Sequence, residues 1–393
     1  MCHQKKCYKH LSFFAILIIC LSMISCSPHS SPSEVYTTNV VKADMQSYGN
    51  YVYTYFGSIY RCDRVTNEFL KACVDPECDG KCPIDGAIAE TDHIENGKLF
   101  FHSFEAYTHK VHYGYQDIIS GKVTILKTLS EMEALNYSRV FVCNGYIYYS
   151  YNILKDGGNA ANEEDYKQHL CRMPIDGGKE EVLMQCDESL IAVIDNKIIT
   201  VSVGTVFSYD IECREKKILW NYSDHGYTVV GAFSALNEKL YFLAGTSNYD
   251  QCKYTNMKLN HNYLISLNVN TGEASRVVEC PIITYSLTDD RIYYSPMVIR
   301  YLYIPENYDN HLNEIVMFRG HETLYSCKLD GTEIREEYTN STVDYIEDYT
   351  VIDGKLYGWI KNFNQDTNSW ENEYFGTIDF ETEIITYIGE RER

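Results

Sequence analysis

The sequence predicts an all-β fold, a seven-bladed β-propeller made of four-stranded antiparallel blades. A short motif, a turn pair followed by aromatic and β-branched residues, occurs seven times along the chain. Its copies are spaced by about 40 to 65 residues, close to the period of propeller blades once insertions are allowed for. Tyrosine is abundant, with 36 residues, whereas proline numbers only 8, a composition that favours strands.

The repeated motif is best seen at Asn144–Ser150, where Asn-Gly precedes Tyr-Ile-Tyr-Tyr-Ser. Asn-Gly pairs adopt the positive φ angles that tight hairpin turns need, and the apolar run is typical of a buried strand. The seven copies begin at Gly49, Asn96, Asn144, Asp195, Asn237, Asp289 and Asp353. We expect each copy to be the second strand of a blade.

The other strands of each blade follow from this assignment. The innermost strand must precede the motif, as in Arg139–Val142 and Tyr349–Ile352. A third strand alternates apolar and polar residues and ends in a turn signal such as Asp176-Gly177, and a fourth strand follows it. Because blades stack face to face, inner strands should read as continuous apolar runs, as Ile147–Tyr149 does.

At 393 residues the length alone would suggest two or three domains, but a closed ring grows by adding repeats. We therefore expect one propeller domain over residues 36–393. The formal net charge is −21, and a surface this acidic repels phosphate backbones, which argues against a nucleic-acid partner. We expect a monomer.

The N-terminus has the pattern of a secretory signal over residues 1–25, with three lysines followed by the uncharged apolar run Leu11–Ile24. The run is short for a permanent transmembrane helix. Ser25-Cys26 resembles the lipobox of bacterial lipoproteins, which implies a lipidated Cys26 and a tether over residues 26–35. Two acyl chains would anchor the domain stably at the outer face of the cytoplasmic membrane. A plain cleaved signal or an uncleaved anchor is the alternative.

Five insertions fall in the connection between second and third strands, across Glu105–Val111, Asn152–Gln168, Thr246–Asn262, Pro296–Glu322 and Lys361–Glu373. In a ring of identical meanders this connection emerges on one face, so we expect one loop-rich binding face around the mouth of the channel. The candidate binding residues lie in the last two of these insertions and are Arg300, Tyr301, Tyr303, Tyr308, His311, Arg319 and Trp370. Alternatively, the aromatics cover a small core within the loop.

Cysteines form one cluster, Cys73, Cys78 and Cys82, in the connection between the first two blades. A disulfide or plain thiols are favoured over zinc, because a zinc site needs four ligands and no nearby fourth is evident beyond His93. The cysteines in or beside strands are expected to be small buried hydrophobes.

Together, the tyrosine-rich second strand, the third strand ending in Asp-Gly, the Ser25-Cys26 pair and the cysteine loop resemble uncharacterised seven-bladed β-propeller lipoproteins of Gram-positive bacteria, a domain-of-unknown-function type. The resemblance covers about residues 36 to 390. It implies the fold and the anchor but not a ligand, since propellers serve many functions.

Catalytic motifs are missing from the sequence. It contains no Gly-x-Ser-x-Gly and no His-Glu-x-x-His, and its three tryptophans are too few for repeated Asp boxes. We therefore expect a noncatalytic binding or interaction module, without a cofactor or metal, whose ligand is a protein, peptide or glycan. Two alternatives stay open: a glycan-acting lyase or hydrolase, and an envelope assembly scaffold.

Overall fold

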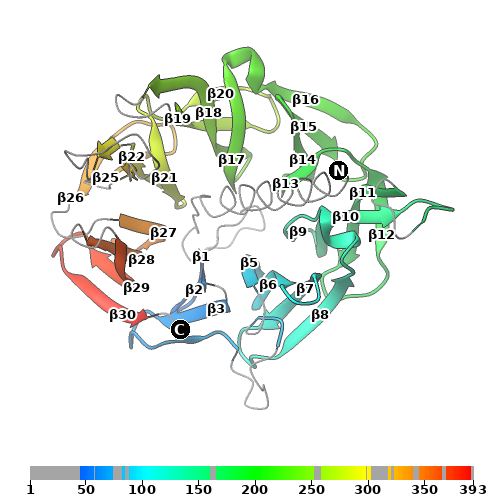
Figure 1. The fold of residues 1–393 in the computed structure, drawn as a ribbon, viewed down its shortest axis with the longest axis horizontal. Helices are drawn as coiled ribbons and strands as arrows, with labels where there is room; N and C mark the ends of the chain where they lie inside the picture. The colour runs from blue at the N-terminus through cyan, green and yellow to red at the C-terminus, as the bar shows by residue number, and fades with distance from the viewer. Residues whose placement is uncertain are drawn as a thin grey trace, which may run out of the picture.

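The computed structural model describes residues 45–56, 58–73, 82–84, 88–159, 165–251, 258–297, 299–301, 317–319, 323–339, 345–364 and 369–390. These residues form seven four-stranded antiparallel sheets, or blades, arranged as a ring, and one separate two-stranded sheet (Figure 1). The predicted seven-bladed propeller is thus confirmed. Within the described part of the chain, no helix has the length and apolar character needed to cross a membrane. The predicted signal and tether lie outside the described residues.

The blades are numbered in chain order. Blades 1 to 3 consist of β1 Met45–Tyr48, β2 Tyr51–Phe56, β3 Ser58–Asp63 and β4 Phe69–Lys71; β5 Ile88–Glu95, β6 Lys98–Glu105, β7 Lys110–Asp117 and β8 Val123–Leu129; and β9 Phe141–Cys143, β10 Tyr146–Leu154, β11 Tyr166–Pro174 and β12 Glu181–Gln185. Blades 4 and 5 consist of β13 Ser189–Ile194, β14 Lys197–Ser202, β15 Thr205–Asp210 and β16 Lys216–Asn221; and β17 Tyr227–Leu236, β18 Lys239–Gln251, β19 Lys258–Asn268 and β20 Ala274–Arg276. Blades 6 and 7 consist of β21 Ile282–Leu287, β22 Arg291–Pro296, β25 Thr323–Lys328 and β26 Arg335–Thr339; and β27 Tyr345–Ile352, β28 Lys355–Asn364, β29 Ser369–Asp379 and β30 Ile385–Glu390. The two-stranded sheet pairs β23 Ile299–Tyr301 with β24 Met317–Arg319, and short 3₁₀ helices cover Glu133–Leu135 and Tyr222–His225.

Each blade is a simple meander in which the first strand is innermost. Strands β1, β5, β9, β13, β17, β21 and β27 surround the axis of the ring (Figure 1). The repeated motif is the second strand of its blade, as predicted. In blade 3, for example, β10 pairs with β9 on one side and β11 on the other.

Turn chemistry explains why the motif forms hairpins. Asn144 and Gly145 have φ angles of 51° and 77°, and Asn96 and Gly97 have 51° and 73°. Both central residues are thus left-handed, which is the type I′ geometry that matches strand twist. The predicted positive φ at the third-to-fourth-strand turn is also found, with 88° at Gly177.

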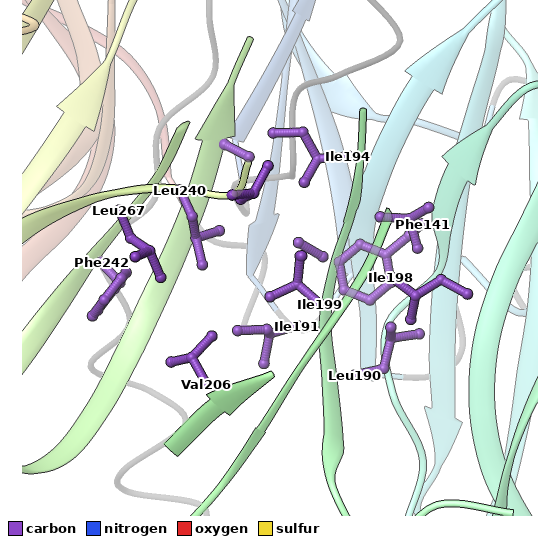
Figure 2. Close-up of a cluster of buried hydrophobic side chains, with 14 of the residues drawn as sticks. Phe141, Leu190, Ile191, Ile194, Ile198, Ile199, Val206, Leu240, Phe242 and Leu267 are labelled. Carbon is purple, nitrogen blue, oxygen red and sulfur yellow. The ribbon is translucent and has the colours of Figure 1, made fainter. Parts of the chain in front are cut away.

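The core lies between stacked blades. Figure 2 shows part of the largest cluster, in which Phe141 of blade 3, Ile191 of blade 4 and Leu240 of blade 5 belong to one buried group. Sheets covered on both faces bury apolar side chains from neighbouring strands. The ring is therefore held together by the interfaces between blades.

Cysteines follow the same rule. Among the residues with described side chains, Cys62, Cys171 and Cys327 are fully buried, and Cys143 and Cys186 nearly so. Cys62, Cys143, Cys171, Cys186, Cys213, Cys280 and Cys327 carry thiols that are not in disulfides. Their expected role as small core residues is confirmed for the five buried ones.

Candidate functional site

Chain direction assigns every connection to one of two faces of the ring. Because each blade begins with its innermost strand, the links between blades and those between second and third strands share one face, which we call the hairpin face. The turns between first and second strands, and between third and fourth, lie on the opposite face.

On the hairpin face the structure corrects one expectation. The insertions were expected to be loops, but the second and third strands continue into them as paired hairpins. In blade 5 the pairing reaches Gln251 opposite Lys258, and in blade 7 it reaches Asn364 opposite Ser369. These stretches lack the alternation of apolar and polar residues by which a half-buried strand is recognised in a sequence.

The predicted binding residues fall on two such hairpins. Arg300 pairs with Phe318, and Tyr301 with Met317, so Arg300, Tyr301 and Arg319 lie on the β23–β24 hairpin of blade 6. Trp370 lies opposite Phe363 in the hairpin of blade 7. Tyr303, Tyr308 and His311 lie outside the described residues.

The shorter hairpins of this face end in exposed apolar side chains. Tyr107, at the tip between β6 and β7, is 100% exposed, and Val203, between β14 and β15, is 97% exposed. Neither side chain stabilises the fold by burial, so both are available for contact with a partner.

Of the predicted cysteine cluster, Cys73 and Cys82 are half-buried and pack against the hydrophobic cluster between blades 1 and 2 that contains Tyr53 and Phe101. Cys78, like the lipidation site Cys26, lies outside the described residues. Across the described part of the chain, no three His, Cys, Asp or Glu residues are placed to hold a metal ion.

Sequence reasoning missed a cluster of polar side chains between blade 2 and the link to blade 3, residues 130–140. The cluster lies beside the half of β5 that is nearer the hairpin face. Both carboxylate oxygens of Asp92 are 2.9 Å from Nδ1 of His102. On the other side of the imidazole, Nε2 of His102 is 3.8 Å from Oε2 of Glu90. Arg139, in the link, donates to the same oxygen across 3.0 Å. The ring of Tyr137 meets the imidazole edge to face, with centroids 5.8 Å apart.

A β-bulge aims Asp92 into this cluster. Thr91 pairs with Phe101 and His93 with Phe100, so Asp92 is the extra residue and has no cross-strand partner. Bulges redirect side chains in this way. Its carboxylate also accepts a hydrogen bond from the backbone N–H of Val140, across 3.2 Å.

The repeat shows how unusual Asp92 is. Four residues before the first turn residue of each blade stand Met45, Asp92, Val140, Ile191, Phe233, Tyr285 and Tyr349. Only Asp92 is charged, and its side chain is fully buried. This break in an apolar column was the sequence signal that could have revealed the cluster, since a buried charge must be paired.

Electrostatics favour a charged imidazole at His102. Burial opposes the charge, but the carboxylates of Asp92 and Glu90 outweigh that effect, and the pKa of His102 is raised above its ordinary value. Burial, with the nearby carboxylates of Glu90 and Asp92, likewise raises the pKa of Tyr137 to about 12. Two cations, His102 and Arg139, thus balance two carboxylates within one cluster.

A His–Asp pair can orient a general base, but here the far nitrogen of His102 faces another carboxylate, Glu90, which is itself bound to Arg139. The groups therefore satisfy one another. The geometry supports a structural or regulatory role at the hairpin face more directly than acid–base catalysis.

A second polar network joins the same two blades. Oε1 of Glu180 accepts from the hydroxyl of Tyr151 across 2.7 Å and from Lys127 of blade 2 across 3.4 Å, while the other oxygen accepts from Tyr149. Burial and the carboxylate raise the pKa of both tyrosines. Through Lys127 this network links blade 2 to three side chains of blade 3.

Comparison with known proteins places the fold only. No family model and no curated protein matches the chain. Among solved structures, a prolyl endopeptidase is 10% identical with a TM-score of 0.52, over 90% of this chain and 50% of that one. The acylaminoacyl peptidase of Pyrococcus horikoshii is 9% identical with a TM-score of 0.51, over 91% and 53%. A puromycin hydrolase is 10% identical with a TM-score of 0.51, over 94% and 57%.

The chain thus spans about half the length of these solved structures. At such identities the likeness shows a shared fold alone and carries no argument about activity.

Proposed function

We propose that the protein is an extracytoplasmic β-propeller, anchored to the membrane through Cys26, that binds a protein, peptide or glycan on its hairpin face without transforming it. The observation that carries the proposal is the concentration of protruding hairpins on one face of a rigid ring. Binding residues are commonly placed on such projections from a fixed scaffold.

The exposed tips strengthen this proposal. Tyr107 and Val203 project from blades 2 and 4, on either side of the blade 3 hairpin. Tyrosine is enriched at the centres of interfaces, because one side chain supplies a large apolar area together with a hydroxyl.

Crosslinking of the full-length protein to partners in envelope extracts tests the binding role. Tyr107→Ser and Val203→Ser should each lower capture about tenfold, which corresponds to about 1.4 kcal/mol of binding free energy. The matched control is Ile119→Ser, because Ile119 is 90% exposed on the opposite face and should leave capture unchanged. Equal losses in all three variants, or none, would refute binding on the hairpin face.

The anchor requires its own experiment. A radiolabelled lipid precursor should label the wild-type protein in cells and fail to label Cys26→Ser. Equal labelling of the two proteins would remove the anchor from the proposal and leave the binding role standing.

A glycan-acting enzyme is the second candidate, and the His102–Asp92 pair is the observation that favours it. Purified protein would be incubated with envelope and plant-wall oligosaccharides, and new chain ends would be counted. If turnover disappears in His102→Gln but persists in His109→Gln, the protein is an enzyme, and the proposal of binding without chemical change is wrong.

A further inference from the structure

We propose that Tyr374 and Tyr387 form a site of oxidative modification, at which a peroxidase-type one-electron oxidant, supplied with hydrogen peroxide, joins the two phenol rings by a carbon–carbon bond. The product is a dityrosine bridge between β29 and β30, the third and fourth strands of blade 7. The bridge requires neither the lipid anchor nor a ligand on the hairpin face.

The two rings lie together because the pairing of β29 with β30 places them on one face of the sheet. Gly376 pairs with Tyr387 and Tyr374 pairs with Glu390, so the two tyrosines are diagonal neighbours, a separation that aromatic side chains can span. Their ring centroids are 3.8 Å apart, with 29° between the ring planes. This is closer than the range of about 4.5–7 Å that most aromatic pairs adopt.

Gly376 makes this close approach possible. It lies directly opposite Tyr387 and has no side chain to separate the two rings. A Cβ at this position would lie 3.2 Å from Cε2 of Tyr374 and 3.0 Å from Cδ1 of Ile360, closer than the best separation of carbon atoms. The glycine therefore reserves the space that the ring of Tyr374 occupies.

The two tyrosines differ in exposure. Tyr387 is 64% exposed on the outermost strand, whereas Tyr374 is 2% exposed and belongs to the hydrophobic cluster shared with blade 6. Burial raises the pKa of Tyr374, and its hydrogen-bonding contact with Tyr387 raises it further. Tyr374 is thus a protonated phenol near neutral pH, with its hydroxyl beside that of Tyr387. Of the two rings, an oxidant in solution reaches that of Tyr387.

The order of oxidation follows from this difference in access. The first oxidation removes one electron and the phenolic proton from Tyr387 and leaves a phenoxyl radical. An electron and the phenolic proton of Tyr374 then pass to Tyr387 across the stacked rings, so the radical moves to Tyr374. A second oxidation of Tyr387 completes a pair of radicals. Because the two rings are already in contact, coupling within the pair is favoured over collision between molecules.

Coupling joins the ring carbons that lie next to the two hydroxyl groups, since these edges of the rings are side by side. One carbon–carbon bond forms and two carbon–hydrogen bonds break. The two ring hydrogens move to the oxygens, which restores both phenols. Hydrogen peroxide takes up the two electrons and the two protons released in the oxidation steps and becomes two molecules of water. The protein therefore loses two hydrogen atoms in all.

Peptide mapping of the purified full-length protein, treated with a haem peroxidase and hydrogen peroxide, tests the site. Cleavage after glutamate separates Tyr374 from Tyr387, because Glu381 and Glu383 lie between them. We expect the two peptides to appear joined, with the loss of two hydrogen atoms and with the fluorescence of dityrosine. Protein treated with the peroxidase but without peroxide should give the two peptides unjoined.

Tyr387→Phe supplies the matched variant, because phenylalanine keeps a ring but forms no phenoxyl radical. The joined peptides should disappear in this variant. Tyr146→Phe is the control, since Tyr146 is 38% exposed on blade 3, and it should leave the bridge unchanged. In the bridged wild type, the amides of β30 should exchange with solvent more slowly than in untreated protein, because the bridge ties β30 to β29.

A mixture of isotope-labelled and unlabelled protein shows whether the bridge forms within one chain. Joined peptides that combine a labelled with an unlabelled partner would overturn the proposal. Treatment that leaves Tyr374 and Tyr387 unjoined, or that joins Tyr374 to any other tyrosine, would overturn it as well. The peptide map of the wild type decides the matter if a variant does not fold.

Discussion

Trp359 of blade 7 donates a hydrogen bond from its indole Nε1 to Oγ1 of Thr54 in blade 1, across 3.1 Å and 305 positions of sequence. Both side chains are buried. Each blade consists of four strands that follow one another in sequence, so no blade of the described chain borrows a strand to close the ring. Side-chain packing between the last blade and the first closes the ring instead, and Figure 1 shows these two blades side by side.

Removing the indole should therefore loosen the junction between the last blade and the first. Phe69 of blade 1 stacks on Phe375, with ring centroids 5.0 Å apart, and meets Trp359 edge to face at 6.0 Å. We expect Trp359→Ala to cost about 3–5 kcal/mol of unfolding free energy, as large cavities do. Urea unfolding would measure it.

The conservative variant separates the hydrogen bond from the packing. Trp359→Phe keeps an aromatic ring and leaves the hydroxyl of Thr54 without this donor, so its cost should be clearly smaller than that of Trp359→Ala. If Trp359→Ala cost less than about 1 kcal/mol, the junction would not depend on this contact.

Two turn glycines should respond differently to the same substitution. Gly145 and Gly331 have φ angles of 77° and 83°. An alanine that adopts such an angle loses about 1–2 kcal/mol of conformational free energy. A Cβ on Gly145 meets nothing within 4 Å, whereas one on Gly331 would clash with the carbonyl oxygen of Val277 in the preceding blade. Gly331→Ala should therefore destabilise the protein considerably more than Gly145→Ala.

Chemical denaturation of the two alanine variants, side by side, provides the measurement. Equal losses would mean that the blades do not pack through this turn. A similar approach occurs at Gly272, where the Cβ would lie 2.7 Å from the carbonyl oxygen of Leu219, so Gly272→Ala should resemble Gly331→Ala.

The fold could be predicted from the sequence because it depends on local and repeated signals. Asn144-Gly145 determines a turn by its backbone preferences alone, and Ile147–Tyr149 shows burial on both faces. The Asp92–His102 contact depends on a one-residue bulge, which the spacing of the repeat does not reveal, although Asp92 itself interrupts an apolar column of the repeat. The Trp359–Thr54 contact depends on where the two ends of the ring meet, and periodicity alone does not pair individual side chains across that junction.

Thiol reactivity should follow burial. Burial raises the pKa of Cys62 to about 12 and that of Cys327 to about 11, so neither forms the nucleophilic thiolate near neutral pH. In the folded protein both should resist iodoacetamide, while half-buried Cys280, whose pKa burial raises as well, should react before either of them because its thiol is more accessible. Peptide mapping by mass spectrometry after timed alkylation would rank them, and labelling of Cys62 as fast as that of Cys280 would contradict the packing described here.

Acid should weaken the protein through the aspartates that cap its turns. Oδ1 of Asp117 accepts the N–H and the hydroxyl of Ser120, each across 2.7 Å, and these bonds lower the pKa of Asp117. Backbone bonds from Glu215 and Arg214 lower the pKa of Asp210 in the same way, although burial opposes them.

A carboxyl whose folded-state pKa is depressed contributes stability that is present above its unfolded value, about 3.9, and is lost as pH falls through the folded value. Unfolding free energy should therefore decrease below about pH 4. Asp117→Asn keeps the acceptor oxygen and removes the titration, so its stability should depend less on pH in that interval than that of the wild type. Asp187→Asn, at an exposed position outside these turns, should keep the wild-type slope. If Asp117→Asn also kept that slope, the turn hydrogen bonds would not be coupled to the proton, and acid unfolding would have to originate elsewhere in the ring.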